Sequence, residues 1–273
     1  MAISSMDTLV AAMTASTAQN ITWNKTNIST EGAGTFHDLA QVAGFPGAML
    51  TPDDAGSGGS SLTSASTGAL PFTAPSGGST LYLLSFSATS TQPGSIYMTD
   101  RLWACRGLAT GSGATTTVTG MSNITRYDGG VGAEIWYWCI SAPSAGGSGS
   151  MTVSYTNTAG VSGRTATITL GAGSPPPSTG QCYPASLQAG DLGVRSIQSV
   201  TNSATSFTGG THGLVVAKRI VTAPISTSSV GTSMDGLRTG MQQIDSNACL
   251  NFVLLCTAST SGFWVGSVQL VEG

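Results

Sequence analysis

Residues Met151–Leu170 read MTVSYTNTAGVSGRTATITL, and this stretch sets the expectation for the whole fold. Two runs rich in Thr, Val and Ile alternate between apolar and polar residues, and a turn containing Asn and Gly lies between them. Such alternation predicts two antiparallel strands joined as a β-hairpin, with one face buried and the other polar. Arg164 is the only charged residue in the stretch, so the polar face is built from Ser and Thr.

The chain repeats this style from residue 53 onward, with short alternating or apolar runs separated by Gly, Pro, Ser and Asn. Further predicted strands cover residues 80–88, 94–99 with a continuation at 102–105, 115–119, 133–140, 191–200, 213–220, 250–257 and 263–271. Strands at such short spacing indicate a mainly β protein, with an antiparallel β-sandwich or jelly-roll-like body. The Pro-rich segment 171–180 leaves open whether 53–273 is one body or two lobes, 53–172 and 181–273.

Residues 1–52 are predicted to form an N-terminal arm with a short helix over residues 4–15. Ser4 or Ser5 can cap this helix, and a carboxylate follows in the first turn. Four apolar residues share one helical face, and we predict that they bind a partner: Met6, Leu9, Val10 and Met13. So short a helix is not stable alone and must dock on something. Residues 35–42 are predicted to form a second short helix, and DDAGSGGSS at 53–61 a flexible joint.

Composition narrows the class of protein. Only 8% of the 273 residues are charged, the net charge is −3, and the mean hydropathy is +0.17. The surface must therefore consist largely of uncharged polar residues, which provide little charge repulsion between copies. The nine Lys and Arg residues form no basic patch, so we expect no nucleic-acid or membrane binding.

The cysteines and the N-terminal sequence indicate the cellular compartment in which the protein is made. The five cysteines lie at 105, 139, 182, 249 and 256 with no C-x-x-C pair, and two of them fall in apolar runs. We expect reduced, buried thiols; a disulfide framework is the alternative. The N-terminal sequence lacks a signal-peptide pattern, and no apolar run is long enough for a membrane span. We therefore expect synthesis in a cytoplasm.

No motif announces catalysis, a cofactor or a metal. His37 beside Asp38, and His212 in GGTHG, are better explained as packed or surface histidines than as members of a triad, since no G-x-S-x-G occurs. Asp53 and Asp54 lack the spacing of a calcium loop. Nucleotide-binding glycine motifs are absent from the sequence. We therefore predict that the protein is not an enzyme.

The aromatic run at 136–138 has two possible interpretations. Alternation puts Trp136 and Trp138 on one face of a strand and Tyr137 on the other. Exposed rings would suit a sugar-binding platform, whereas buried rings would pack a core. The apolar neighbours Ile135 and Ile140 favour the core.

Several segments resemble virion structural proteins of tailed bacteriophages. They are MAISSMDTLVAAM, WNKTNIST, TFHDLAQVAGFPGA, SYTNTAGVSGRT, LQAGDLGVRSIQSV and ACLNFVLL. The resemblance extends over most of the chain, but it brings no catalytic residues. It implies a β-rich protein displayed on a phage particle, as a capsid decoration or cement protein. A fibre or tail-associated location stays open.

The resemblance and the composition give two functional expectations. The first is a capsid decoration protein of the virion, made in the bacterial host cytoplasm, that contacts the major capsid protein or other virion proteins and forms a homo-oligomer. The alternative is a fibre or tail-associated β-sandwich that recognises host surface carbohydrate. An enzyme such as a depolymerase ranks last, because clustered acids or a triad are not evident in the sequence.

Overall fold

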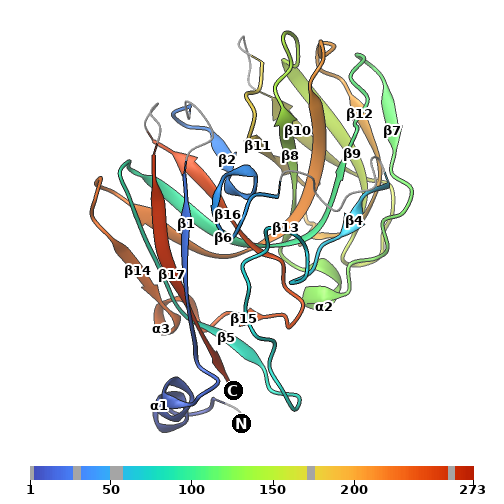
Figure 1. The fold of residues 1–273 in the computed structure, drawn as a ribbon. Coiled ribbons are helices and arrows are strands. Elements are labelled where there is room, and N and C mark those ends of the chain that lie inside the picture. Colours follow the sequence, from blue (N-terminus) through green and yellow to red (C-terminus); the bar gives the residue numbers. More distant parts are fainter. Residues whose placement is uncertain (1–2, 27–31, 50–57, 171–175, 258–261) are drawn as a thin grey trace.

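The computed structural model describes residues 3–26, 32–49, 58–170, 176–257 and 262–273. These residues form a mainly β protein in which all strand pairings are antiparallel, so the predicted fold class is confirmed at that level (Figure 1). The described strands form a smaller sheet of six strands and a larger sheet of eleven. Residues 53–57 of the predicted joint 53–61, and with them Asp53 and Asp54, lie outside the described residues, as do residues 171–175 of the Pro-rich segment 171–180.

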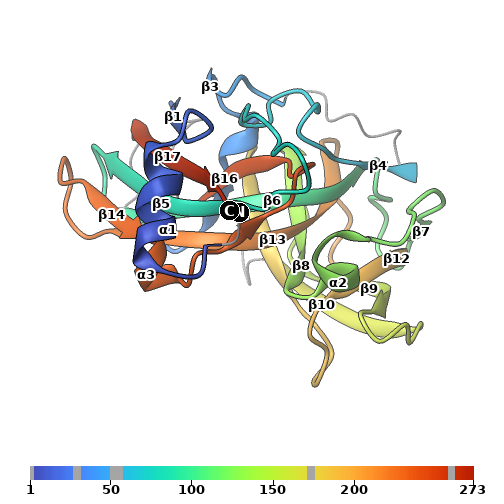
Figure 2. The same ribbon diagram turned by 90° about the horizontal axis from the view of Figure 1, so that it is seen from below.

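The smaller sheet lies at one side of the molecule, with the helix α1 (Met6–Thr14) across its end (Figures 1 and 2). Its strands, in spatial order, are β14 (Thr232–Asp235), β5 (Leu81–Ser90), β17 (Trp264–Glu272), β1 (Gln19–Lys25) and β3 (Gly44–Phe45), while β15 (Gln243–Ile244) also pairs with β5. The segment predicted as an arm thus supplies strand β1 to this sheet, between β17 and β3.

The larger sheet begins at β2 and ends at β7. Its strands are β2 (Phe36–Asp38), β16 (Leu250–Cys256), β6 (Gly94–Arg106), β13 (Thr211–Ile225), β8 (Ala133–Ser141), β11 (Gln181–Ser186), β10 (Arg164–Leu170), β9 (Gly149–Asn157), β12 (Val194–Asn202) and β7 (Thr115–Thr117), with β4 (Ser60–Ser61) on β6. Strand β2 also pairs with β11, so the described strands from β2 through β16, β6, β13 and β8 to β11 close into a six-stranded barrel. The predicted hairpin extends the barrel as a further layer.

The hairpin is confirmed as strands β9 and β10. Tyr155 pairs with Arg164 at the turn end, and Ile168 pairs with Met151 further along. The alternation predicted from the sequence is complete, because every second residue is fully buried: Met151, Val153, Tyr155, Ala166, Ile168 and Leu170. Arg164 Nε donates to Asp191 Oδ2 at 2.9 Å, which ties the hairpin to the loop before β12.

The buried apolar side chains of the described residues form three clusters. One cluster fills the space between the smaller sheet and the barrel wall, where Trp23 of β1 stacks on Phe252 of β16 at 4.2 Å between ring centroids. A second lies between the barrel and the layer formed by β9, β10 and β12. The third contains Trp136 and Trp138 of β8. Strands β6 and β13, the longest described, contribute to all three clusters and therefore hold the layers together.

Residues 35–42 do not form the predicted α-helix. They form β2 followed by a single 3₁₀ turn, η1 (Leu39–Gln41), so that prediction was wrong. Strand β2 pairs with β11 on one side and with β16 on the other. These pairings outweigh the weak helical pattern, because they satisfy backbone N–H and C=O groups that a short helix would leave without hydrogen-bond partners. Strand β11 was missed, since Pro184 interrupts its pattern. Residues 236–239 form one helical turn, α3 (Gly236–Thr239).

Candidate functional sites

The N-terminal helix α1 is capped as the sequence predicts. Ser5 is its N-cap, the Ser5 hydroxyl accepts a hydrogen bond from the Thr8 backbone N–H, and the Thr8 hydroxyl accepts one from the Ser5 N–H. This reciprocal arrangement satisfies two backbone donors at the helix start. The helix therefore has a defined beginning and presents its side chains in fixed directions.

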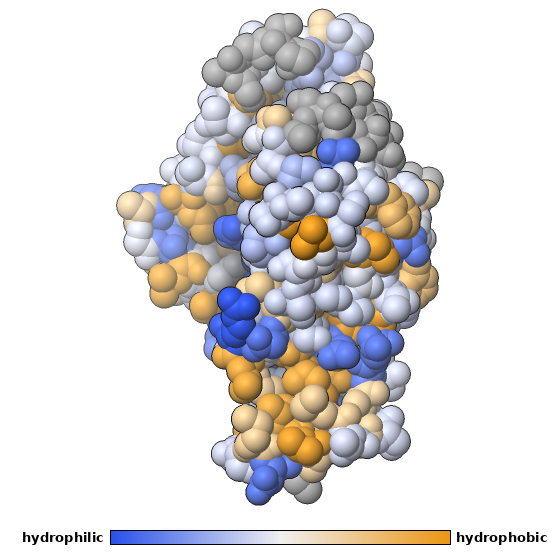
Figure 3. Space-filling view, turned by 90° about the vertical axis from the view of Figure 1, so that its left-hand side faces the viewer, coloured by the Kyte–Doolittle hydropathy of each residue, from blue (hydrophilic) through white to orange (hydrophobic). Residues whose placement is uncertain are grey.

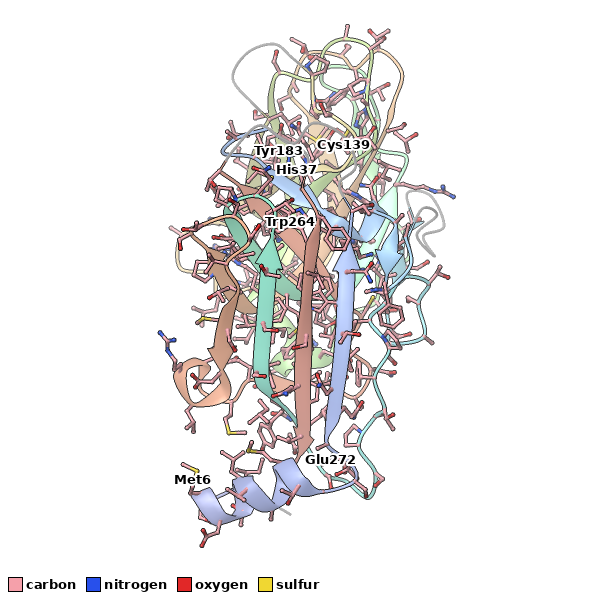
Figure 4. All side chains as sticks on the ribbon, turned by 60° about the vertical axis from the view of Figure 1, so that its left-hand side comes forward. Met6, His37, Cys139, Tyr183, Trp264 and Glu272 are labelled. Atoms are coloured by element: carbon pink, nitrogen blue, oxygen red, sulfur yellow. The ribbon has the colours of Figure 1, made fainter. Side chains whose placement is uncertain are left out.

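The four apolar residues predicted to bind a partner divide into two groups. Leu9 is buried against the body, whereas Met6, Val10 and Met13 are 59%, 52% and 48% exposed. We call these three residues the α1 surface. Figure 3 shows hydrophobic side chains gathered at this end of the molecule, and Figure 4 shows Met6 on the helix that crosses below the sheet. So much exposed methionine and valine on a rigid, capped element is typical of a protein contact surface.

A groove of about 330 Å³ continues the α1 surface along the smaller sheet. Its apolar lining includes Met13 and Ala18 from the N-terminal segment and Leu84 and Val271 from β5 and β17. The groove joins apolar side chains to the uncharged amides Gln19 and Gln269. None of the residues of the α1 surface or of the groove lining is charged.

A second candidate site lies around α2 (Arg126–Gly130), where the smaller sheet meets the barrel. We call it the Arg126 cleft. It encloses about 360 Å³, and its lining comes from α2, β13 and the segment around β15: Thr125, Arg126, Tyr127, Asp128, Val131, Lys218, Gln242, Gln243 and Asp245. A cavity of about 250 Å³ adjoins it and shares Thr125, Arg126 and Asp245. None of these residues was predicted as a site from the sequence, because they come from three distant segments.

Backbone strain sets the shape of the Arg126 cleft. Tyr127, Asp128 and Gly129 are successive left-handed residues, with φ of 55°, 52° and 78°. Non-glycine residues rarely adopt this conformation, and it persists only where the surroundings enforce it. Gly130, with φ of 94°, follows so closely against Val194 O that a side chain would not fit. The RYDGG sequence was the available signal, since Asp-Gly and Gly-Gly mark tight turns.

Arg126 and Asp100 hold the floor of this cleft in place. Arg126 Nη1 donates to both carboxylate oxygens of Asp100 at 2.8 and 2.9 Å, and Nη2 donates to Leu62 O at 2.6 Å. Asp100 also accepts from the Tyr127 hydroxyl and the Cys249 backbone N–H, each at 2.8 Å. Burial raises the pKa of Asp100 to about 6, although these partners oppose the shift. Asp100 is fully buried and saturated with hydrogen bonds, so it positions Arg126 and Tyr127 rather than meeting a ligand itself.

Lys218 closes one side of the cleft. Its ammonium lies 4.1 Å from the centroid of the Tyr127 ring, a cation–π contact that covers one ring face. Partial burial lowers the pKa of Lys218, while Asp128 and Asp100 oppose the shift. Tyr127 also packs against two of the apolar clusters, so the groups that remain to receive a ligand are hydrogen-bonding ones rather than a bare aromatic platform.

The histidines do not form a catalytic arrangement. His37 is buried and its Nε2 accepts from the Gly32 N–H at 3.2 Å, while the neighbouring Asp38 turns to Arg101 instead. His212 Nδ1 lies 2.6 Å from the Tyr137 hydroxyl, inside the second apolar cluster. Burial lowers the pKa of both histidines, that of His37 to about 4. The interpretation as packed histidines is therefore confirmed for both.

The Trp136 and Trp138 rings are buried, as the strand pattern favoured, with exposed fractions of 4% and 0%. Tyr137 on the opposite face is also fully buried, because β8 lies between two cores. The two tryptophans therefore offer no open sugar platform. All five cysteines are buried as well, and burial raises the pKa of Cys139 and Cys249 to about 12.

A buried lysine was not foreseen from the sequence. Lys25 Nζ donates to Val42 O at 3.1 Å and to Pro46 O at 2.7 Å, and desolvation lowers its pKa to about 8. An amine with this pKa could be a nucleophile, but its side chain is fully buried. It therefore acts as a tie between β1 and the segment that follows η1.

The described residues contain no group of three or more His, Cys, Asp or Glu side chains that could hold a metal ion. Within the same part of the chain, every helix is too short or too polar to cross a membrane. A scan against models of known protein families, and searches of curated proteins and of solved structures, found no match to this chain.

Proposed function

We propose that this protein is a structural component of a bacteriophage virion, most simply a capsid decoration or cement protein that acts through protein–protein contacts. The virion assignment rests on the sequence resemblance. The observation that carries the contact role is the α1 surface, because Met6, Val10 and Met13 are exposed on a capped helix that Leu9 fixes to the body. In this proposal the partner is the major capsid protein or another virion protein, the protein forms a homo-oligomer, and no reaction is catalysed.

The uncharged surface supports this proposal. A protein with 8% charged residues has little repulsion between neighbouring copies, which suits dense packing on a particle. Binding energy would come from apolar burial, at about 25 cal/mol per Å² of apolar area before ordering costs. We also propose that the smaller sheet covers the barrel as in the β-sandwich or jelly-roll-like body predicted from the sequence.

The test is particle association of a triple variant, Met6→Ser, Val10→Ser and Met13→Ser. We expect it to fold normally and to be lost from purified particles, as measured by quantitative mass spectrometry. The matched control changes three apolar residues with similar or greater exposure away from α1, Val161, Leu192 and Val230, to Ser. Full occupancy by the α1 variant would overturn the contact role. Absence of the unmodified protein from particles would overturn the virion assignment, and its copy number separates decoration from a neck, tail or fibre location.

The alternative function is a fibre or tail-associated module that recognises host surface carbohydrate. The burial of Trp136 and Trp138 removes the aromatic platform that the sequence offered for it. One observation still favours it, namely the polar Arg126 cleft.

A further inference from the structure

The Arg126 cleft has the volume of a small-molecule site, and its lining groups are held in fixed positions. Its volume of about 360 Å³ falls in the range of known ligand pockets. Its floor is held by the buried Asp100–Arg126 pair, and its rim by the left-handed run at Tyr127 and Asp128. Fixing groups in this way lowers the entropic cost of binding, and strained backbone concentrates at such sites.

The charges in the cleft restrict what it can bind. In the lining, two positive side chains, Arg126 and Lys218, face two negative ones, Asp128 and Asp245, while Asp100 lies buried beneath Arg126. Because Arg126 is already paired with Asp100, the cleft offers no excess positive charge, which disfavours phosphates and other anions. The predominantly polar lining disfavours an apolar ligand, because its polar groups would lose their water without gaining new partners.

The groups that remain available at the rim both donate and accept hydrogen bonds. Gln242 Nε2 donates to Thr239 O, and this contact does not use the side-chain oxygen of Gln242. Gln243 and Asp128 are exposed. Amides and the Thr125 hydroxyl can donate or accept, the carboxylates accept, and Lys218 donates. A ligand that matches this mixture carries several hydroxyl groups, each of which is itself a donor and an acceptor.

We propose that the Arg126 cleft binds a neutral saccharide whose hydroxyl groups donate to Asp128, accept from Lys218 and exchange hydrogen bonds with Gln243. This site is independent of the α1 surface and lies on a different part of the molecule (Figure 1). Binding through hydrogen bonds without an open aromatic ring is weak, so display of many copies would be needed for strong attachment. The proposal does not depend on the virion assignment, since the purified protein alone is sufficient to test it.

The test combines an array of neutral and anionic bacterial surface oligosaccharides with saturation-transfer NMR. The NMR probes are the methyl glycosides of glucose, galactose, mannose and N-acetylglucosamine. Two variants probe the cleft, Asp128→Asn, which keeps a residue tolerant of positive φ, and Gln243→Ala on the short strand β15. Their matched controls are Asp7→Asn on α1 and Gln92→Ala in the turn between β5 and β6. Unchanged melting temperatures establish that all four variants fold.

We expect at least one neutral saccharide to bind, and each cleft variant to weaken that binding about tenfold, the effect of one lost hydrogen bond to a charged or amide group. The control variants should bind like the unmodified protein. The proposal fails if the array and all four glycosides give no signal. It also fails if a saccharide binds but neither cleft variant weakens it, or if only anionic saccharides bind.

Discussion

Asp100 and Arg101 are neighbours on β6, and they close two separate buried ion pairs with different parts of the chain. Arg101 Nη1 donates to Asp38 Oδ2 of β2 at 2.6 Å, and Asp100 accepts from Arg126 of α2. Successive residues of a strand point to opposite faces, so Arg101 secures β2 through Asp38, whereas Asp100 secures α2 through Arg126. In a chain with so few charges, these pairs join segments that are far apart in sequence.

The Asp100–Arg126 pair predicts a large effect of removing one partner. Arg126→Met should lower the free energy of unfolding by about 3–5 kcal/mol, because it leaves a buried carboxylate without its cation. Urea denaturation measures the change. The control is Arg219→Met, which breaks the more exposed pair with Glu134 and should cost at most about 1 kcal/mol. Similar losses in the two variants would contradict the structural role of Arg126.

The buried His37 predicts acid sensitivity. Burial lowers its pKa from 6.5 to about 4, so between these values the unfolded chain binds a proton that the folded protein does not. The resulting stability is present above pH 6.5 and is lost as the pH falls toward 4, at up to about 1.4 kcal/mol per pH unit.

The experiment compares the pH dependence of unfolding for the unmodified protein and His37→Gln. The variant should show a smaller loss of stability between pH 6.5 and 4. Asp100 acts in the opposite direction in an overlapping range, since its raised pKa favours the folded state as the pH falls, and it is unchanged in both proteins. Parallel pH profiles would show that His37 is not protected from protons in the folded state.

The cysteines predict slow thiol chemistry in the folded protein. All five are buried, and the raised pKa values of Cys139 and Cys249, about 12, leave little thiolate at pH 8. A thiol reagent such as Ellman's reagent should react slowly with the native protein and promptly with all five thiols after denaturation. Rapid labelling of the native protein, or fewer reactive thiols after denaturation without reductant, would contradict this expectation.

Gly266 on β17 predicts a steric limit in the smaller sheet. A Cβ at this position would lie 1.9 Å from Ser87 O and 2.8 Å from the Trp23 ring. Gly266→Ala should therefore destabilise the protein by about 1–3 kcal/mol, the usual cost of overpacking a core. Gly47→Ala is the matched control, because a Cβ there meets nothing within 4 Å. Thermal unfolding measures both, and equal melting temperatures would show that the Ser87 backbone and the Trp23 ring can both shift without cost.

Much of the secondary structure could be predicted from the sequence because its signals are local. Period-two alternation places Met151, Val153 and Tyr155 on one face whatever the rest of the chain does, and the structure buries all three. The same holds for the helix of α1, where Ser5 provides the cap and Leu9 the contact with the body. Residues 35–42 misled the prediction because a three-residue strand carries too short a pattern to compete with a helical one.

The two candidate sites differ in how far they were predictable. The α1 surface lies within one helix, so spacing alone identified Met6, Val10 and Met13, and tertiary structure only showed that Leu9 is the residue used for docking. The Arg126 cleft draws on residues from 125 to 245, and isolated polar residues carry no sequence signal for their partners.

The sequence by itself determined the mainly β character, the central hairpin, the capped N-terminal helix and the uncharged composition, because these depend on the order of neighbouring residues. Only the tertiary structure decided the closure of the barrel, where β2 pairs with both β16 and β11, and the pairing of Asp100 with Arg126. Both involve partners distant in the chain, and which partner is chosen depends on how all the layers pack. The backbone groups at a strand edge need hydrogen-bond partners, and a buried carboxylate needs a positive partner. Many segments of the chain could supply these partners, and the fold selects the one that it places nearby.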